Sequence, residues 1–163
     1  CGKFCDNKWW QTATAADVQA ELDAGADVNT RMDYGVAPLH YAIGEKRNQD
    51  PEIAIKNLEN VKLLVNAGAN VNARISNGIS PLSMAVGVNH QELAEFLMVA
   101  GANVNARSKV GISAVAMAVR NNNQEMVELL IAAGAYVDAL VFEKVTALAL
   151  AVKIQNVEMV EIF

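Results

Sequence analysis

Residues 68–85 read Gly-Ala-Asn-Val-Asn-Ala-Arg-Ile-Ser-Asn-Gly-Ile-Ser-Pro-Leu-Ser-Met-Ala and hold two short motifs that recur along the chain. The first motif, Gly-Ala-x-Val-Asn/Asp, occurs at 25–29, 68–72, 101–105 and 134–138, so its glycines are spaced by 43, 33 and 33 residues. The second motif, at 80–85, is matched at 37–42, 113–118 and 146–151 with the same spacings. Two motifs that keep one period indicate a repeat protein.

The second motif predicts the start of a first helix in each repeat. Ser80 can cap a helix through its hydroxyl, and Pro81 suits the first helical position, where its missing N–H costs nothing. Thr146 can cap in the same way, whereas Ala37 precedes Pro38 and has no side chain for capping.

Apolar residues at helical spacing predict a second helix in each repeat. They fall at i, i+3, i+4 and i+7 over residues 58–65, 91–98, 124–131 and 157–163. Glycines then stand where helices commonly end with a positive φ: Gly25, Gly68, Gly101 and Gly134. The sequence therefore predicts pairs of helices separated by turns.

The period near 33 residues and the form of the second motif resemble ankyrin repeats over nearly the whole chain. The resemblance implies an all-α solenoid of stacked antiparallel helix pairs with protruding β-turn fingers, about four to five repeats long. One domain, 1–163, is then expected. Its units are an N-terminal half-repeat 6–30, repeats at about 31–73, 74–106 and 107–139, and a truncated last repeat 140–163.

Three departures from the pattern carry expectations of their own. The half-repeat should hold Trp9, Trp10 and a helix at 16–24 capped by Thr14, with one tryptophan shielding the end of the core. Repeat 31–73 is ten residues longer than the others, and its extra segment near 44–57 includes a helix start at Asp50-Pro51. This insertion is either a tolerated change on one face, which we favour, or a partner-binding element. In the last finger Lys144 replaces a glycine and predicts a distorted turn.

Composition bounds the function classes. With 53% hydrophobic and 19% charged residues, the chain is expected to fold. Its net charge of −5 and its scattered basic residues argue against a nucleic-acid partner. No apolar run reaches the roughly 18 residues that span a bilayer, so no transmembrane segment is expected. The start at Cys1 and the end within an apolar pattern at 161–163 are interpreted as those of a processed chain or a fragment.

The resemblance also implies a protein partner bound on the concave side, which fingers and first helices form. The positions that vary within the family give these candidates: Asp33, Tyr34, Val36, Glu45, Ser76, Asn77, Ile79, Val88, Lys109, Val110, Ile112, Arg120, Asn121, Phe142, Glu143, Val145, Lys153 and Ile154. The apolar row Val36, Ile79, Ile112 and Val145 has a structural alternative, because its members could pack under the fingers. Val110, Phe142 and Ile154 are harder to explain structurally. Tyr34, Phe142 and Arg120 are the expected anchors, since interfaces favour aromatics and arginine.

Residues with potential chemistry have simpler interpretations. His40 and His90 occupy positions that ankyrin repeats use structurally, and no catalytic residue, cofactor site or metal site is expected. Arg74 and Arg107 recur one period apart, which the repeat itself explains without a basic site.

Cys1 and Cys5 leave three alternatives open. They could form a disulfide, which implies an oxidising compartment, or they could be free thiols. In the third alternative, Cys1 carries the lipid of a bacterial lipoprotein, because Cys1-Gly2-Lys3 resembles the start of a mature lipoprotein. The sequence Gly-Ala-Asp-Val-Asn at 25–29 resembles that of bacterial ankyrin proteins. A periplasmic or membrane-anchored location is favoured, with the cytoplasm as the alternative, and one lipid chain gives only marginal anchoring.

The sequence therefore predicts a monomeric, non-catalytic module that binds a protein partner. The alternative is a structural spacer, or a regulatory part of a larger or membrane-anchored protein, without catalysis of its own. Fold alone does not decide between these functions.

Overall fold

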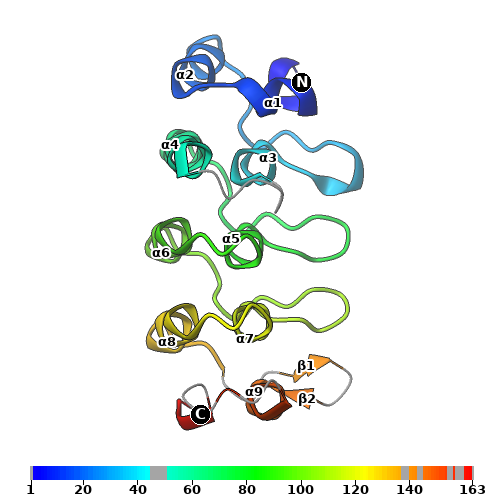
Figure 1. The fold of residues 1–163 in the computed structure, drawn as a ribbon. Coiled ribbons are helices and arrows are strands. Elements are labelled where there is room, and N and C mark those ends of the chain that lie inside the picture. Colours follow the sequence, from blue (N-terminus) through cyan, green and yellow to red (C-terminus); the bar gives the residue numbers. More distant parts are fainter. Residues whose placement is uncertain are drawn as a thin grey trace.

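The computed structural model describes residues 2–44, 51–136, 140–142, 145–153, 156 and 160–162. Side chains are described for these residues except 51–56, 140–142, 145, 147, 150 and 153. Helices form two parallel columns, and loops project from one of them like fingers (Figure 1). The predicted all-α solenoid of helix pairs with protruding fingers is confirmed.

Successive helices from α2 to α9 alternate between the two columns. The inner column, beside the fingers, holds α3, α5, α7 and α9, and the outer column holds α2, α4, α6 and α8 (Figure 1). The elements are η1 Gly2–Cys5, α1 Asn7–Thr12, α2 Ala15–Asp23, η2 Asp33–Gly35, α3 Pro38–Ile43, α4 Pro51–Asn66, α5 Pro81–Gly87, α6 Gln91–Val99, α7 Ala114–Arg120, α8 Gln124–Ala132, β1 Leu140–Phe142, β2 Val145–Thr146 and α9 Ala147–Lys153. We call residues 30–37, 73–80 and 106–113 the first, second and third fingers.

Hydroxyl caps begin the inner helices, as the second motif predicts. Ser80 Oγ accepts the Ser83 N–H at 3.2 Å at the start of α5, and Thr146 Oγ1 accepts the Ala149 N–H at 3.1 Å at the start of α9. Ala37 makes no side-chain cap at α3. These contacts satisfy backbone donors that the first helical turn leaves unpaired.

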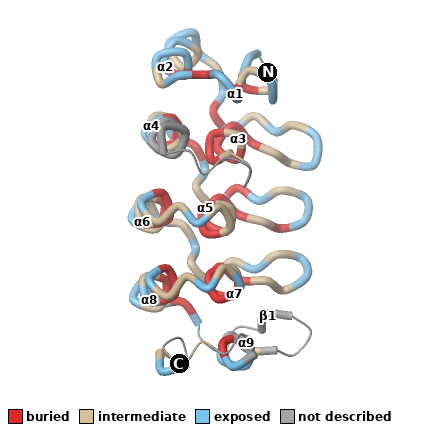
Figure 2. The backbone as a smooth tube through the Cα atoms, viewed as in Figure 1, coloured by how far each residue is buried: buried red, intermediate tan, exposed pale blue. Residues whose placement is uncertain are grey.

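Small and branched apolar residues fill the space between the columns. Ala85 and Ala118 of the inner helices are fully buried, as are Leu93 and Leu97 of α6. Figure 2 shows that the inner helices α3, α5 and α7 are mostly buried, whereas exposed residues lie along the fingers and on the side of the outer helices away from the inner column. One repeat cannot bury these faces alone, so stacking supplies the core.

Aromatic side chains close the N-terminal end of this core. Phe4 is fully buried, Trp10 is 7% exposed, and Trp9 packs against the core. The Trp9 and Trp10 ring centroids are 4.9 Å apart, and Trp10 Nε1 donates to the Phe4 carbonyl at 2.9 Å. The prediction that a tryptophan shields the end of the core is confirmed, and Phe4 joins it.

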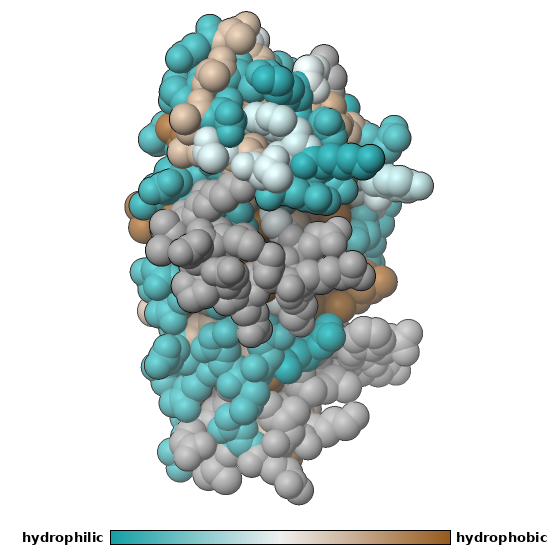
Figure 3. Space-filling view, turned by 45° about the horizontal axis from the view of Figure 1, so that its top comes forward, coloured by the Kyte–Doolittle hydropathy of each residue, from teal (hydrophilic) through white to brown (hydrophobic). Residues whose placement is uncertain are grey.

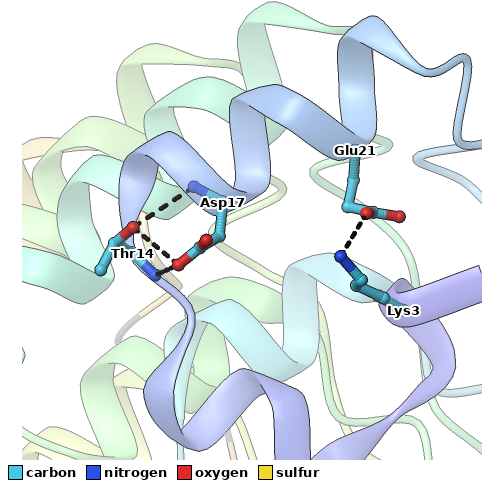
Figure 4. A network of polar contacts seen from close by, with 4 residues as sticks. All are labelled: Lys3, Thr14, Asp17 and Glu21. Carbon is cyan, nitrogen blue, oxygen red and sulfur yellow. Dashed lines mark hydrogen bonds and ion pairs between the residues drawn. The ribbon is translucent and has the colours of Figure 1, made fainter.

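The predicted half-repeat holds two helices, α1 and α2, where the sequence pattern predicted one. α1 has only six residues, too few for apolar periodicity to reveal it, and Asp6 caps it by accepting the Lys8 N–H. The expected Thr14 cap of α2 is confirmed: Thr14 and Asp17 exchange hydrogen bonds as a capping box, and Lys3 pairs with Glu21 at 3.1 Å (Figure 4).

The ten-residue insertion lengthens an outer helix. α4 begins at Pro51, as predicted, and has 16 residues, whereas α6 has 9. Asn57 Nδ2 donates to the Ile43 carbonyl at 3.3 Å and ties the longer helix to the end of α3. The cap expected at Asp50 lies outside the described residues.

In the last repeat, which begins at about residue 140, β1 and β2 pair antiparallel with an irregular register between Leu140 and Phe142. Only an isolated bridge, Arg107 with Ser113, occupies the equivalent place in the third finger. Lys144, where a distorted turn is expected, lies outside the described residues.

Candidate protein-binding surface

Asparagines at the base of the fingers fix the spacing of the repeats. Asn72 Oδ1 accepts the Asn103 N–H at 2.7 Å, and its Nδ2 donates to the Gly101 carbonyl at 3.0 Å. Asn29 and Asn105 make the same pair of bonds to the repeats that follow them. Each side chain therefore satisfies two backbone groups of the next repeat and holds successive fingers in register.

The fingers also contact one another directly. The Ser76 N–H donates to the Tyr34 carbonyl at 2.6 Å, and the Lys109 N–H donates to the Asn77 carbonyl at 2.8 Å. Tyr34 and Asn77 occupy equivalent places in successive fingers. The fingers thus form a continuous, hydrogen-bonded surface beside the inner helices.

Tyr34, at the tip of the first finger, is both exposed and strained. Its side chain is 79% exposed, and its backbone has a φ of +60°. A bulky residue rarely adopts this left-handed conformation, and such strain tends to persist at functional sites. Among the described residues, positive φ at a non-glycine position recurs only at Asn89 and Asn122, in the turns between helices.

The apolar candidates divide into exposed and half-buried members. Val110 at the third finger tip is 67% exposed, whereas Val36, Ile79 and Ile112 are half-buried. Ile112 packs against the core, so the structural alternative holds for it. Figure 3 shows hydrophobic residues at the surface on the finger side of the molecule and others at the opposite edge.

The polar candidates are mostly accessible. Exposed side chains are Asp33, Ser76, Asn77, Lys109 and Arg120. Val88 is half-buried, and half-buried Asn121 donates from Nδ2 to the Val86 carbonyl at 3.0 Å, so it ties α7 to α5. Glu45, Glu143 and Ile154 lie outside the described residues, as do the side chains of Phe142, Val145 and Lys153.

Sequence reasoning missed a set of arginines on this surface. Arg31 Nη1 donates to the Gly35 carbonyl at 2.9 Å and to the Arg74 carbonyl at 3.1 Å. Arg74 repeats the arrangement one finger further, from Nε to the Gly78 carbonyl and from Nη2 to the Arg107 carbonyl. All three arginine side chains are exposed. The recurrence of an arginine in each of these three fingers was the signal that could have identified them. The repeat period accounts for the recurrence but not for the exposure of the arginine side chains.

His40 is structural, as expected. It is 3% exposed; Nδ1 accepts the Ala37 N–H at 3.1 Å, and Nε2 lies 3.2 Å from the Ala73 carbonyl of the second finger. This pattern requires a neutral ring protonated at Nε2. Burial lowers the pKa of His40, against the effect of the hydrogen bond to the Ala73 carbonyl, and the nearby Arg31 charge lowers it further.

The lowered pKa of His40 predicts a loss of stability in mild acid. Below the unfolded pKa of about 6.5, the unfolded chain takes up a proton that the folded chain resists, so stability falls as the pH decreases. Urea midpoints of the wild type should therefore fall more than those of His40→Gln between about pH 7 and about pH 5.5. His90 and the carboxylates are common to both chains, so parallel profiles would contradict this origin.

The other residues with potential chemistry also have structural environments. His90 Nδ1 lies 3.3 Å from the Leu93 N–H and caps α6. Cys5 is disulfide-bonded, which excludes the free-thiol alternative for this residue. Cys1, the other cysteine of the sequence, lies outside the described residues.

Across the part of the chain that the structure describes, no group of three or more His, Cys, Asp or Glu side chains is placed to hold a metal ion. Nor does any described helix combine the length and apolar character needed to cross a membrane.

Comparison with known proteins supports the repeat architecture. The family model described as ankyrin repeats (3 copies) matches residues 52–140 and 82–163. No curated protein matches the chain. Ankyrin repeats generally mediate protein–protein interaction and are generally non-catalytic. Since the matched residues make up more than half of the sequence, the chain belongs to the ankyrin repeat family.

Proposed function

We propose that this chain is a binding module that holds a partner protein against its fingers and inner helices, without catalysis of its own. The exposed and strained Tyr34 carries the proposal. A side chain that is 79% exposed contributes little to packing, and its left-handed backbone costs stability. Contact with a partner accounts for the presence of a large aromatic residue at this position, because aromatic residues are enriched at interfaces.

Val110 extends the same surface. It is 67% exposed at the tip of the third finger, where the fingers are joined by the bond from the Lys109 N–H to the Asn77 carbonyl. Two exposed hydrophobic tips on one rigid surface can enter the same interface without reordering the backbone.

Partner capture from a lysate of the source organism tests the proposal. The variant Tyr34→Gly/Val110→Ser should lose the captured protein and keep or raise its melting temperature, because glycine relieves the strained φ. The matched control Tyr136→Ser/Val99→Ser also removes an exposed tyrosine and an exposed valine. Tyr136 is 66% exposed and Val99 is 90% exposed, and both lie outside the fingers.

Capture that is lost with the finger variant and kept with the control supports a binding module acting through the fingers. Capture lost equally with both variants would contradict that location. If the wild type retains no protein specifically, the spacer function is favoured instead.

We also propose that the chain works in an oxidising compartment, because structural disulfides such as that of Cys5 are rare where thiols are kept reduced. A thiol in a disulfide is not available for a lipid thioether, so the lipoprotein alternative needs an uncrosslinked Cys1. The intact mass before and after reduction separates the two: a gain of hydrogen on reduction supports the disulfide, and acyl mass that survives reduction supports the lipid anchor.

A further inference from the structure

The finger surface and the outer helices carry opposite charge. Among the described side chains of the fingers and inner helices, the basic residues are Arg31, Arg74, Arg107, Lys109 and Arg120, and the one acidic residue is Asp33. On the described side chains of α2, α4, α6 and α8, the acidic residues are Asp17, Glu21, Asp23, Glu59, Glu92, Glu95, Glu125 and Glu128, and the one basic residue is Lys62. A chain with a net charge of −5 thus presents a basic surface where its fingers lie.

Three of these basic residues form what we call the arginine column: Arg31, Arg74 and Arg107, one in each finger. The guanidinium of Arg31 reaches the Arg74 carbonyl, and that of Arg74 reaches the Arg107 carbonyl. These carbonyl bonds fix the position of the first two charges without neutralising them. The remaining guanidinium N–H groups are suited to bidentate contact with a carboxylate.

No carboxylate of the described chain neutralises the column. Within the described residues, Lys3 forms an ion pair with Glu21, and His90 Nδ1 lies 3.3 Å from the Glu92 carboxylate; neither contact involves the fingers. Asp33 neighbours Tyr34 at the tip of the first finger and is the one acid on this surface. A row of fixed, unneutralised cations attracts an anionic partner and speeds its association.

We propose that the arginine column binds an acidic segment of the partner protein, with Lys109 and Arg120 completing the basic surface. This inference rests on the proposed binding function and adds the chemistry of the partner. Specific contacts to carboxylates then provide orientation, while Tyr34 and Val110 provide apolar contact.

Repeat geometry indicates the spacing of the acids. Neighbouring inner helices α5 and α7 are packed together, and packed helices lie about 8–10 Å apart. One turn of a polyproline-type chain, three residues long, advances about 9 Å. An acidic side chain at every third residue of such a segment would therefore meet one arginine per repeat.

A labelled peptide of repeating Glu-Pro-Pro is a direct probe, with repeating Gln-Pro-Pro as the neutral control. We expect the wild type to bind the acidic peptide at least about ten-fold more tightly at low salt, with an affinity that falls as salt rises. Arg31→Gln/Arg74→Gln/Arg107→Gln should lose this preference. The control Lys3→Gln/Lys8→Gln/Lys62→Gln changes the net charge equally, away from the fingers, and should keep it.

A second variant is needed because Arg31 and Arg74 also bind finger carbonyls, so replacing them could disturb the structure of the fingers as well as remove their charge. Lys109→Gln/Arg120→Gln should weaken peptide binding while circular dichroism and the melting temperature stay at wild-type values. Its charge-matched control is Lys8→Gln/Lys62→Gln, which should bind as the wild type does.

Equal affinity for the acidic and neutral peptides would overturn the inference, as would equal losses in the finger and control variants. A single-stranded oligothymidine that binds the column more tightly than the acidic peptide would overturn it in favour of nucleic acid. These failures differ from failure of the proposed function, which is judged by the dependence of partner capture on Tyr34 and Val110.

Discussion

Replacing Leu97 with alanine is expected to lower the free energy of unfolding by about 2–5 kcal/mol, as buried leucine truncations do. Leu97 lies in α6, between α4 and α8 in the outer column, and is fully buried, as are the equivalent Leu64 and Leu130 of α4 and α8. Removal of its side chain leaves a cavity between repeats that the stacked neighbours cannot close, because each is tied to the next by the asparagine bonds.

Val99→Ala is the matched control, because it truncates an apolar side chain on the same helix. Val99 is 90% exposed, so its removal should change stability by no more than about 0.5 kcal/mol. Urea unfolding followed by circular dichroism gives both values. A loss of stability from Val99→Ala as large as that from Leu97→Ala would contradict the assignment of Leu97 to the buried face of α6 and of Val99 to its exposed face.

Gly78→Ala should be the second severe substitution, with a loss of about 2–5 kcal/mol. Gly78 has a φ of +82°, and an added Cβ would lie 2.9 Å from the Lys109 backbone nitrogen and 3.2 Å from the Ser108 carbonyl carbon. Both are backbone atoms of the third finger and cannot rotate away. The substitution therefore combines left-handed strain with separation of two fingers.

Gly111→Ala isolates the strain from the contact between fingers. Gly111 has a φ of +83°, and no atom lies within 4 Å of an added Cβ. Its loss should be about 1–2 kcal/mol, the cost of the left-handed backbone alone. Melting temperatures of the two variants give the comparison. Equal losses would mean that the close approach of the second and third fingers contributes nothing to stability.

Much of the fold followed from local rules that a single sequence displays. Gly25, Gly68, Gly101 and Gly134 have positive φ where helix ends were predicted, and Thr14 and Ser80 cap helices as expected. Each of these positions is governed by its immediate neighbours, so no tertiary context was needed to predict it.

Features set by distant contacts could not be predicted in this way. A tryptophan was expected at the end of the core but Phe4 was not, because the ring contact of Phe4 with Trp10 depends on where η1 and α1 lie. The strain at Tyr34 was equally hidden, because Asn77 and Val110 occupy equivalent places without a positive φ. Propensity predicts a glycine or asparagine at such a position and cannot anticipate a tyrosine.

The arginine column shows the limit most directly. From the sequence, Arg74 and Arg107 needed no explanation beyond the repeat period. The fold adds what spacing lacks: the carbonyl contacts that link the arginines from finger to finger, and the acids placed on the opposite column. From the sequence, the candidate surface was expected on the fingers and inner helices, and its basic charge became evident only in the fold.

The identical asparagine bonds at Asn29, Asn72 and Asn105 also bear on how such a chain changes length during evolution. A duplicated copy of residues 74–106, inserted after position 106, would find the same backbone donor and acceptor at both of its new boundaries. Unequal recombination within the gene could therefore add a whole unit without a new contact having to arise by mutation. Each added repeat would bring one more arginine to the column. The length of the basic surface, and hence the length of ligand that it can contact, would therefore change by one repeat at a time.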